Sequence, residues 1–513
     1  MAWPFEPDSS YVYLTDLLRG LKYEMLLART IVEKVQAAFI ADNNKDVPLN
    51  AFLEMYDDVL VRAQEISMET ALARVNGRGE QLFNDKPLMG IPFAVKDNIS
   101  VQGRHLSCAS RILEGYVAPY NATVVQRLID AGAFPIARCN QDEFAMGSST
   151  EYSIYGPTRN PLNRCYVSGG SSGGPAAAVA ANWVPFALGT ETGGSVRLPA
   201  SYCGIYGLKP TYGVLSRWGV VAYGSSLDQV GILARCPQDI AMVLSVTAGV
   251  DFYDDTSASL PDVASTVEPW GDFGSLRVAI PRQFIESPGL DADVAEVFEA
   301  VRRWFEHKGS HVDVVDLPVL DAAVASYYVI ALSEAASNLS RFDGIRYGHR
   351  VDKGKGYDEL YVDTRSRGFG PEVKRRIIIG NYVLSEQFSG STYKKGMSVR
   401  ARIQREVAEL FASYQLILCP TCPTAAFKLG QKVDDPLEMY LSDLFTTFVN
   451  LARIPSLSVP AGRTKEEHDA MPVGIQFAGP MFSEMKILSI AQSWEEDHPG
   501  CGVPIKGGLE LCS

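Results

Sequence analysis

Two serines stand in glycine-rich segments whose composition suits nucleophilic chemistry. Ser171 lies in "GGSSGG", residues 169–174, and Ser195 follows 24 residues later in "GTETGGSVR". Glycines beside a serine allow several backbone N–H groups to turn toward one point, which is the layout of an oxyanion hole. We therefore expect Ser195, behind Gly193 and Gly194, to lie where a negative oxygen would form.

A serine nucleophile needs a base, and the sequence offers a lysine. Lys96 ends the apolar run "GIPFAVK" and is followed by the turn signal "DN". Lysine acts as a base when burial or a nearby cation lowers its pKa from about 10.4 toward neutrality. A Ser-Lys pair is one known arrangement, and a Ser-His-Asp triad stays open as the alternative. None of the six histidines lies in a glycine-rich turn: His105, His307, His311, His349, His468 and His498.

Other uses of the glycine run fit the sequence less well. A phosphate-binding P-loop requires a lysine directly after the last glycine, and the residue after Gly174 is Pro175. A dinucleotide fingerprint requires GxGxxG, which the run does not contain. A flexible linker is disfavoured because an alanine-rich helical pattern follows at once.

Taken together, the three segments resemble the amidase signature family, whose catalytic unit is Ser-cis-Ser-Lys. On that resemblance, "VKDN" supplies the lysine, Lys96, "GGSSGG" the middle serine, Ser171, and "TGGSVR" the nucleophile, Ser195. The resemblance implies that the peptide bond before Ser171 is cis. It also implies that the Ser171 side chain relays a proton between Ser195 and Lys96. It implies an α/β fold with a large mixed central β-sheet surrounded by helices, and an oxyanion hole at Thr192, Gly193 and Gly194.

Further segments are similar to the glutaminase subunits of tRNA-dependent amidotransferases, over roughly residues 10–490. They are "RCNQDEFAMGSSTE", "SSLDQVGILAR", "RFDGIRYG", "GFGPEVKRRI" and "DPLEMYLSDLFTTFVNLARIPSLSVPAG". The resemblance implies that Arg376 binds the carboxylate of glutamine and Asp443 its amino group. It also implies a tyrosine at the pocket edge, either Tyr327 or Tyr328.

The resemblance further implies that glutamine is hydrolysed and that the ammonia serves the amidation of Glu-tRNA(Gln) or Asp-tRNA(Asn). Two other subunits, B and C, would complete a heterotrimer, and the partner would make most tRNA contacts. No cofactor or metal is expected in this chain, whereas ATP and Mg²⁺ are expected in the partner subunit. Two alternatives remain: a free-standing amidase for small amides, and an inactive scaffold, which the intact Lys96, Ser171 and Ser195 disfavour.

Three positions depart from the family pattern. Pro175 stands where serine or glutamate is usual, Phe448 where proline is expected, and Arg453 where glycine is expected. Proline is tolerated in a first helical turn. Phe448 and Arg453 follow Asp443 in the sequence, so they bear on substrate preference and not on the chemistry.

Composition excludes several functions for the 513-residue chain. Its net charge of −13 disfavours non-specific binding to nucleic acid. No apolar run approaches the ~20 residues of a membrane span, and the N-terminus lacks a secretory signal, so we expect a cytoplasmic protein without membrane contact. The nine cysteines lack regular spacing, and Cys419 and Cys422 in "CPTC" are expected to be ordinary buried or loop cysteines.

The elements that must position these residues alternate between strands and helices, which indicates an α/β architecture. We expect one amidase domain over residues 1–513, with a helical N-terminal layer at 1–80. A core at 81–250 would carry Lys96, Ser171 and Ser195, and residues 275–495 would carry the substrate-binding groups. Between about 250 and 275 the chain is polar and rich in Pro and Gly, which predicts a connection. Basic stretches at 373–380 and 393–405 are expected to be helices with mostly solvated charges.

Overall fold

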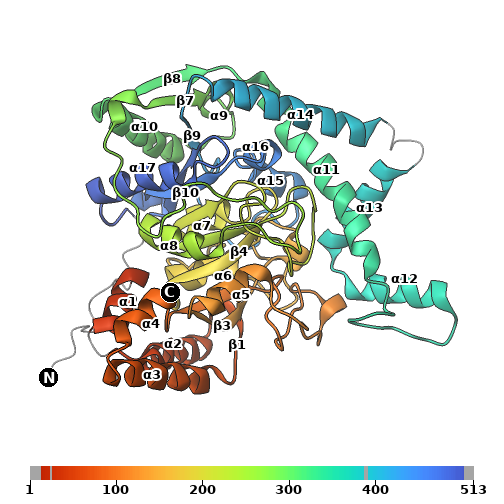
Figure 1. The fold of residues 1–513 in the computed structure, drawn as a ribbon. Helices are drawn as coiled ribbons and strands as arrows, with labels where there is room; N and C mark the ends of the chain where they lie inside the picture. Colours follow the sequence, from red (N-terminus) through yellow and green to blue (C-terminus); the bar gives the residue numbers. More distant parts are fainter. Residues whose placement is uncertain (1–12, 24–25, 386–390, 502–513) are drawn as a thin grey trace.

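The computed structural model describes residues 13–23, 26–385 and 391–501. Within them, eleven strands form one mixed sheet (Figure 1). In sheet order they are β1 (Phe52–Met55), β3 (Phe134–Cys139), β2 (Pro92–Lys96), β4 (Phe186–Glu191), β6 (Gln229–Ala234), β5 (Tyr206–Lys209), β10 (Ser456–Arg463), β11 (Pro472–Ala478), β9 (Leu416–Pro420), β7 (Arg277–Pro281) and β8 (His311–Val315). The predicted fold class is confirmed. Strands from both predicted segments share this sheet, since β5 pairs with β10.

The described part of the N-terminal layer holds four helices: α1 (Leu14–Tyr23), α2 (Ala28–Asn43), α3 (Val59–Val75) and α4 (Gly79–Asp85). They lie together at one end of the molecule (Figure 1). The layer also contains β1, which the helical expectation for residues 1–80 missed. β1 has only four residues and pairs antiparallel with β3, so a distant partner and not a local pattern creates it.

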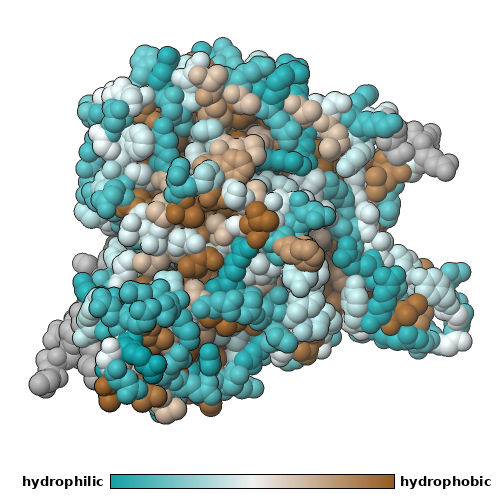
Figure 2. All heavy atoms as spheres, viewed as in Figure 1, coloured by the Kyte–Doolittle hydropathy of each residue, from teal (hydrophilic) through white to brown (hydrophobic). Residues whose placement is uncertain are grey.

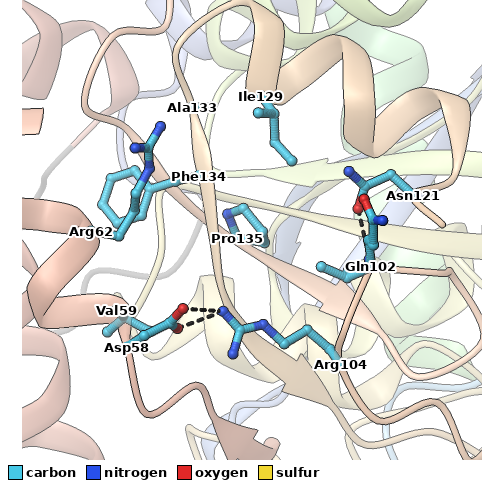
Figure 3. Close-up of a pocket in the computed structure, with 11 residues that line it drawn as sticks. Asp58, Val59, Arg62, Gln102, Arg104, Asn121, Ile129, Ala133, Phe134 and Pro135 are labelled. Carbon is cyan, nitrogen blue, oxygen red and sulfur yellow. Dashed lines mark hydrogen bonds and ion pairs between the residues drawn. The ribbon is translucent and has the colours of Figure 1, made fainter. Parts of the chain in front are cut away.

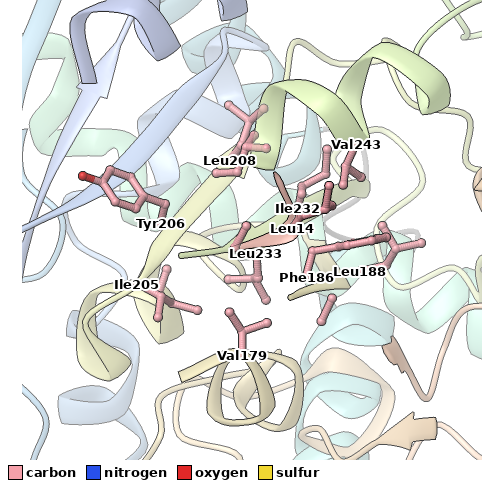
Figure 4. Close-up of a cluster of buried hydrophobic side chains, with 14 of the residues drawn as sticks. Leu14, Val179, Phe186, Leu188, Ile205, Tyr206, Leu208, Ile232, Leu233 and Val243 are labelled. Carbon is pink, nitrogen blue, oxygen red and sulfur yellow. The ribbon is translucent and has the colours of Figure 1, made fainter. Parts of the chain in front are cut away.

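Two short helices cover the centre of the sheet: α6 (Gly173–Ala180) and α7 (Arg197–Cys203). All residues of both helices are buried. Apolar strands of the central sheet pack with them and with Leu14 of α1 in one hydrophobic core (Figure 4). Because α6 is apolar on every side, its burial between layers is the expected outcome. Ser171 and Ser195 thus precede two helices that the core holds in place.

The remaining helices complete the body and a separate flank. The body includes α5 (Thr123–Asp130), α8 (Pro237–Thr247), α9 (Arg282–Ile285), α10 (Ala292–His307), α15 (Pro436–Leu441), α16 (Thr447–Ala452) and α17 (Glu484–Asp497). The flank consists of α11 (Ala323–Asn338), α12 (Tyr357–Gly368), α13 (Pro371–Leu384) and α14 (Thr392–Leu410), at the right of Figure 1. The predicted irregular connection at 250–275 is present. Apolar residues on the face in Figure 2 form small, separate patches among hydrophilic ones.

One prediction about apolar runs was too strong. In the described chain, the helical stretch Pro318–Arg341 is long and apolar enough to cross a membrane by length and composition. Most of its apolar part is buried inside the protein. The stretch contains α11, which packs against α13, α14 and α16. A helix with several packing partners is apolar over most of its surface for that reason.

Candidate active site

Lys96 ends β2 and is fully buried beneath the glycine-rich segment. Its Nζ lies 2.7 Å from Ser171 Oγ, 2.9 Å from Ser172 Oγ and 3.2 Å from the Thr190 carbonyl oxygen. Thr190 belongs to β4, which is parallel to β2 and adjacent to it. The sheet therefore holds the lysine between two strands and against the two serines.

Burial sets the charge of this lysine. It lowers the pKa of Lys96 to about 7, although the negative charges of Asp142 and Asp228 act in the opposite direction. A substantial fraction of Lys96 is therefore neutral at physiological pH. Burial alone therefore lowers the pKa of Lys96 far enough for it to act as the predicted base, and no neighbouring cation is needed.

The hydrogen-bond pattern indicates which serine can give a proton to the neutral amine. The Ser172 hydroxyl donates to the Thr190 carbonyl oxygen at 3.1 Å, so its proton is already used. A neutral amine has two N–H groups and one lone pair. When the N–H groups of Lys96 donate to Ser172 and Thr190, the lone pair is left for the hydroxyl of Ser171.

The glycines of the run leave room for the backbone. The peptide bond between Gly170 and Ser171 is cis, as the resemblance implies. A Cβ on Gly170 would lie 2.2 Å from Asp142 Oδ2 and 2.6 Å from Ser149 N. No side chain can occupy that position, because real Cβ atoms do not approach other atoms so closely. The glycine that the sequence places before Ser171 is therefore required by close packing.

Ser195 lies in the turn between β4 and α7 and is nearly buried, at 9% exposed. Its carbonyl oxygen accepts a hydrogen bond from Ser172 N at 3.1 Å, which joins the two serine segments. Within the described chain, the Ser195 hydroxyl has no hydrogen-bond partner, and the N–H groups of residues 192–195 donate to no protein acceptor. The arrangement leaves a free hydroxyl beside a group of free donors, as an oxyanion hole requires.

A buried ion pair fixes this turn. Glu191 accepts hydrogen bonds from the backbone N–H groups of Val196 and Arg197, and its carboxylate pairs with the Arg197 guanidinium. Arg197 also donates to the Thr446 carbonyl oxygen at 2.9 Å and to Asn450 Oδ1 at 2.7 Å. The end of β4 is therefore tied to the segment that contains Asp443.

Arg376 is buried on α13 and is not one of the solvated charges expected in this basic stretch. Its Nε donates to Glu372 Oε1 at 2.7 Å, and its Nη1 donates to the Tyr223 hydroxyl at 2.9 Å. The rings of Tyr223, Tyr328 and Tyr440 lie within 5.2–5.9 Å of the guanidinium carbon. Despite its burial, nearby tyrosines and Glu372 hold the pKa of Arg376 well above its usual value. Arg376 is a fixed cation in an aromatic enclosure.

Asp443 is a buried carboxylate that the described residues provide with no cationic partner. Its Oδ2 accepts from Ser148 Oγ at 2.9 Å and from the Tyr328 hydroxyl at 3.4 Å. Burial raises its pKa to about 7, and the field of Arg376 acts to lower it. A bound ammonium would supply the missing cation and would lower this pKa.

Asp443 and Tyr327 lie next to the turn of residues 192–195, which we call the oxyanion turn. A Cβ on Gly193 would lie 2.5 Å from Tyr327 Cζ, and one on Gly194 would lie 3.1 Å from Asp443 Oδ1. The two candidate tyrosines thus have different places, because Tyr327 contacts the turn whereas Tyr328 contacts Asp443. A small amino acid held by Asp443 would therefore place its other end near Ser195.

Sequence reasoning missed several residues that shape this site: Asp142, Ser148, Glu191, Arg197, Tyr223, Asp228, Glu372 and Tyr440. Most of them support another residue of the site, and no local sequence pattern marks them for this role. Glu372 is the exception, because it precedes Arg376 by four residues on an expected helix, where opposite charges meet. The four-residue spacing could have predicted that Arg376 forms an ion pair with Glu372.

All three departures from the family pattern have a defined place in the structure. Arg453 has a φ of +64° at the end of α16, in the left-handed region where glycine is favoured, and its guanidinium lies 4.8 Å from the Tyr212 ring. Phe448 is fully buried against Phe284. Pro175 is the third residue of α6, in the first turn.

A histidine base finds no geometric support, because in the described chain none of the six histidines hydrogen-bonds to Ser171 or Ser195. His105, His311 and His468 have mainly exposed side chains that contact Glu54, Asp313 and Asp293. Cys419 and Cys422 are buried free thiols, as expected. Among the described residues, no cluster of His, Cys, Asp and Glu could hold a metal ion.

A separate hollow of about 320 Å³ lies between the N-terminal layer and β3 (Figure 3). Arg104 pairs there with Asp58, and Phe134 and Pro135 form part of the wall. None of the predicted site residues lines it. The candidate active site is thus the buried arrangement around Ser195 and not this surface hollow.

The mixed sheet, the buried pair of Lys96 and Ser171, and the free Ser195 after two glycines are together the features of an amidase. The model of the Amidase family matches residues 46–488, and the chain belongs to this family. The A subunit of the glutamyl-tRNA(Gln) amidotransferase from Treponema denticola is 54% identical, covering 94% of this chain and 98% of that protein. The protein of that name from Lachnoclostridium phytofermentans is 44% identical, covering 91% and 94%. The crystal structure of the protein of that name from Thermotoga maritima matches with a TM-score of 0.77 and 34% identity, over 99% of this chain and 100% of that one.

Proposed function

We propose that this chain is the glutaminase subunit of a tRNA-dependent amidotransferase. The observation that carries the chemistry is the 2.7 Å contact between Lys96 Nζ and Ser171 Oγ, in a site where burial brings the pKa of the lysine to about 7. The relatives named as A subunits of glutamyl-tRNA(Gln) amidotransferases, at 42–54% identity, support the choice of reaction. Glutamine is the proposed source of ammonia.

The proposed reaction begins with two proton transfers. Ser171 passes its proton to the neutral Lys96 and accepts the proton of Ser195, while Ser195 Oγ attacks the side-chain amide carbon of glutamine. The free N–H groups of residues 192–195 stabilise the oxyanion. Collapse breaks the C–N bond, and the proton returns through Ser171 to the leaving ammonia. Water then hydrolyses the γ-glutamyl ester by the same relay, which releases glutamate and restores Ser195.

Recognition of glutamine follows from its charges. Arg376 binds the α-carboxylate, and Asp443 binds the α-ammonium, for which it has no competing cation among the described residues. Tyr327 lies against Gly193 and closes the side of the pocket beside the oxyanion turn. Fixing both charges leaves the amide as the group that reaches Ser195.

The ammonia passes to a partner subunit, where ATP and Mg²⁺ support amidation of Glu-tRNA(Gln) or Asp-tRNA(Asn). The B and C subunits complete the heterotrimer, and this chain binds no cofactor of its own. The complex works in the cytoplasm. The acidic net charge of −13 fits a chain that leaves most tRNA contact to its partner.

The test is purification of the tagged chain from its native host, followed by identification of its partners by mass spectrometry. The purified complex should convert Glu-tRNA(Gln) or Asp-tRNA(Asn) to the amidated form when given glutamine and ATP. Ammonia release by the chain alone, with no partner and no tRNA amidation, would instead identify the free-standing amidase.

We expect hydrolysis to rise with pH through about 7. Lys96 has a lowered pKa of about 7, so its neutral, active form accumulates above that pH and is lost as the pH falls. The pKa of Asp443 is also about 7, so glutamine turnover contains two ionisations. A neutral ester, p-nitrophenyl acetate, does not use Asp443 and should report the lysine alone.

The matched control is Lys209→Met, because Lys209 is a second buried lysine whose pKa burial lowers to about 7. It donates to the Pro210 carbonyl oxygen and to Gln229 but touches neither serine. The pH limb of ester hydrolysis should persist in this variant and in each single histidine replacement. Loss of the limb in one of the histidine variants would favour a histidine base.

A further inference from the structure

Asp228 lies directly opposite the oxyanion turn because of strand register. In the antiparallel pair of β4 and β6, Glu191 faces Gln229 at the last paired position. Thr192, the residue after β4, begins the turn, and Asp228, the residue before β6, lies across from it. The sheet therefore brings a carboxylate from a distant loop to the start of the turn that contains Gly193 and Ser195.

The carboxylate of Asp228 is fully engaged as an acceptor. Its Oδ1 accepts from the Thr192 hydroxyl at 2.6 Å and from Gly224 N at 3.0 Å, while Oδ2 accepts from Tyr223 N at 2.8 Å. Asp228 is only 5% exposed and forms no ion pair among the described residues. Burial raises the pKa of Asp228 to about 6, and these three hydrogen bonds offset only part of the cost of burying the charge.

One of those bonds leads to the opposite end of the pocket. The backbone of Tyr223 donates to Asp228, and the hydroxyl of the same tyrosine accepts from Arg376 Nη1 at 2.9 Å. Tyr223 is itself buried, and its carbonyl oxygen accepts from Asn338 of α11 at 3.1 Å. A short chain of contacts thus joins the Thr192 side of the turn to the cation proposed for the substrate carboxylate.

We infer that Asp228 is a positioning residue that fixes the oxyanion turn and the carboxylate-binding Arg376 relative to each other. This inference rests on the proposed glutaminase function. Glutamine must reach Arg376 and the oxyanion turn at the same time, so an error in their separation weakens both binding and attack. A substrate without a carboxylate uses only the turn.

The chemistry of the carboxylate makes the inference testable with a nearly isosteric change. Asparagine has one acceptor oxygen and one NH₂ group, so Asp228→Asn directs a donor at another donor on at least one side. Either the Gly224 contact or the Tyr223 contact must then be lost, because both are backbone donors, whereas the Thr192 hydroxyl can reverse its role and accept. The volume of the side chain is nearly unchanged, so packing is preserved.

Asp254→Asn is the matched control. Asp254 lines the same surface hollow of about 200 Å³ as Asp228, and it is similarly buried at 7% exposed. Its carboxylate accepts from the backbone N–H of Arg217 and from Thr256 and pairs with the Arg217 guanidinium, and it makes no contact with the oxyanion turn. The control removes a buried charge from the same neighbourhood without touching the proposed link.

The experiment measures kcat and KM for glutamine and for p-nitrophenyl acetate in the complex carrying wild-type chain, Asp228→Asn or Asp254→Asn. For Asp228→Asn we expect glutamine kcat/KM to fall about 100-fold, with a higher KM and a lower kcat, and a smaller loss on the ester. Asp254→Asn should retain wild-type values on both. Equal losses on the two substrates with an unchanged glutamine KM, or no loss at all, would overturn the inference.

Two further variants keep the test decisive if Asp228→Asn does not fold. Thr192→Val removes the hydroxyl on one side and should lower kcat on both substrates by a similar factor. Tyr223→Phe removes the acceptor of Arg376 and should raise the glutamine KM, with a loss on glutamine that exceeds the loss on the ester. The reverse pattern would overturn the inference. Failure of the wild-type complex to release ammonia from glutamine would instead overturn the proposed function.

Discussion

Replacing Ser195 with alanine is expected to abolish ammonia release from glutamine, with a loss of at least about 10⁴-fold in kcat. The reason is that the other hydroxyl in the turn after β4, that of Thr192, donates to Asp228, whereas the Ser195 hydroxyl is unengaged beside the free N–H groups of residues 192–195. The Ser195 hydroxyl has no hydrogen-bond partner among the described residues, so the fold should be retained. Ammonia release and the thermal unfolding midpoint should be measured on the same preparation.

Lys96→Ala should cause a loss nearly as large, because Ser171 then has no base to receive its proton. Ser171→Ala should be strongly impaired, since it breaks the relay between the lysine and Ser195. Members of one catalytic unit are not additive, so Lys96→Ala/Ser195→Ala should be little worse than Ser195→Ala. Wild-type turnover in Lys96→Ala would remove the lysine from the mechanism.

The parts of this site that the sequence predicts are those with a local pattern. Lys96 could be placed at a strand end from the apolar run before it, and the glycines around Ser171 and Ser195 indicated tight turns. The α/β architecture and the helix after Ser171 followed from local patterns, whereas the mixed sheet was implied by the family resemblance and the helix after Ser195 was not predicted. The binding residues, Arg376 and Asp443, required a family resemblance, because a single arginine on a helix has no distinctive local signal.

The parts that could not be predicted depend on contacts between distant segments. β1 exists because β3 offers it a partner, and Asp228 meets Thr192 only through the register of β4 and β6. The burial of Arg376 likewise depends on Tyr223, more than 150 residues away in the chain. One long apolar stretch, Pro318–Arg341, was also overlooked in the sequence, and its helix α11 packs inside the protein.

The pocket residues should act on substrate choice and not on the reaction itself. Arg376→Ala leaves the substrate carboxylate without its cation in a buried site, so glutamine kcat/KM should fall by about 100-fold or more. Asp443→Ala should cause a comparable loss, because the ammonium is then buried without its partner. p-Nitrophenyl acetate carries neither charge, so its hydrolysis should be affected far less in both variants while Lys96, Ser171 and Ser195 are intact.

Arg375→Ala is the matched control for the arginine. Arg375 is the neighbouring residue on α13 and pairs with the same Glu372, but its side chain is 42% exposed. Its removal takes a half-exposed positive charge from the helix without opening the pocket, and the buried Glu372 keeps its contacts with Arg376 and Tyr440, so glutamine turnover should stay within about twofold of wild type. A parallel loss on glutamine and ester in Arg376→Ala would mean that Arg376 supports the fold and not recognition. An unchanged glutamine rate in Arg376→Ala and Asp443→Ala would mean that other residues hold the two charges of the substrate.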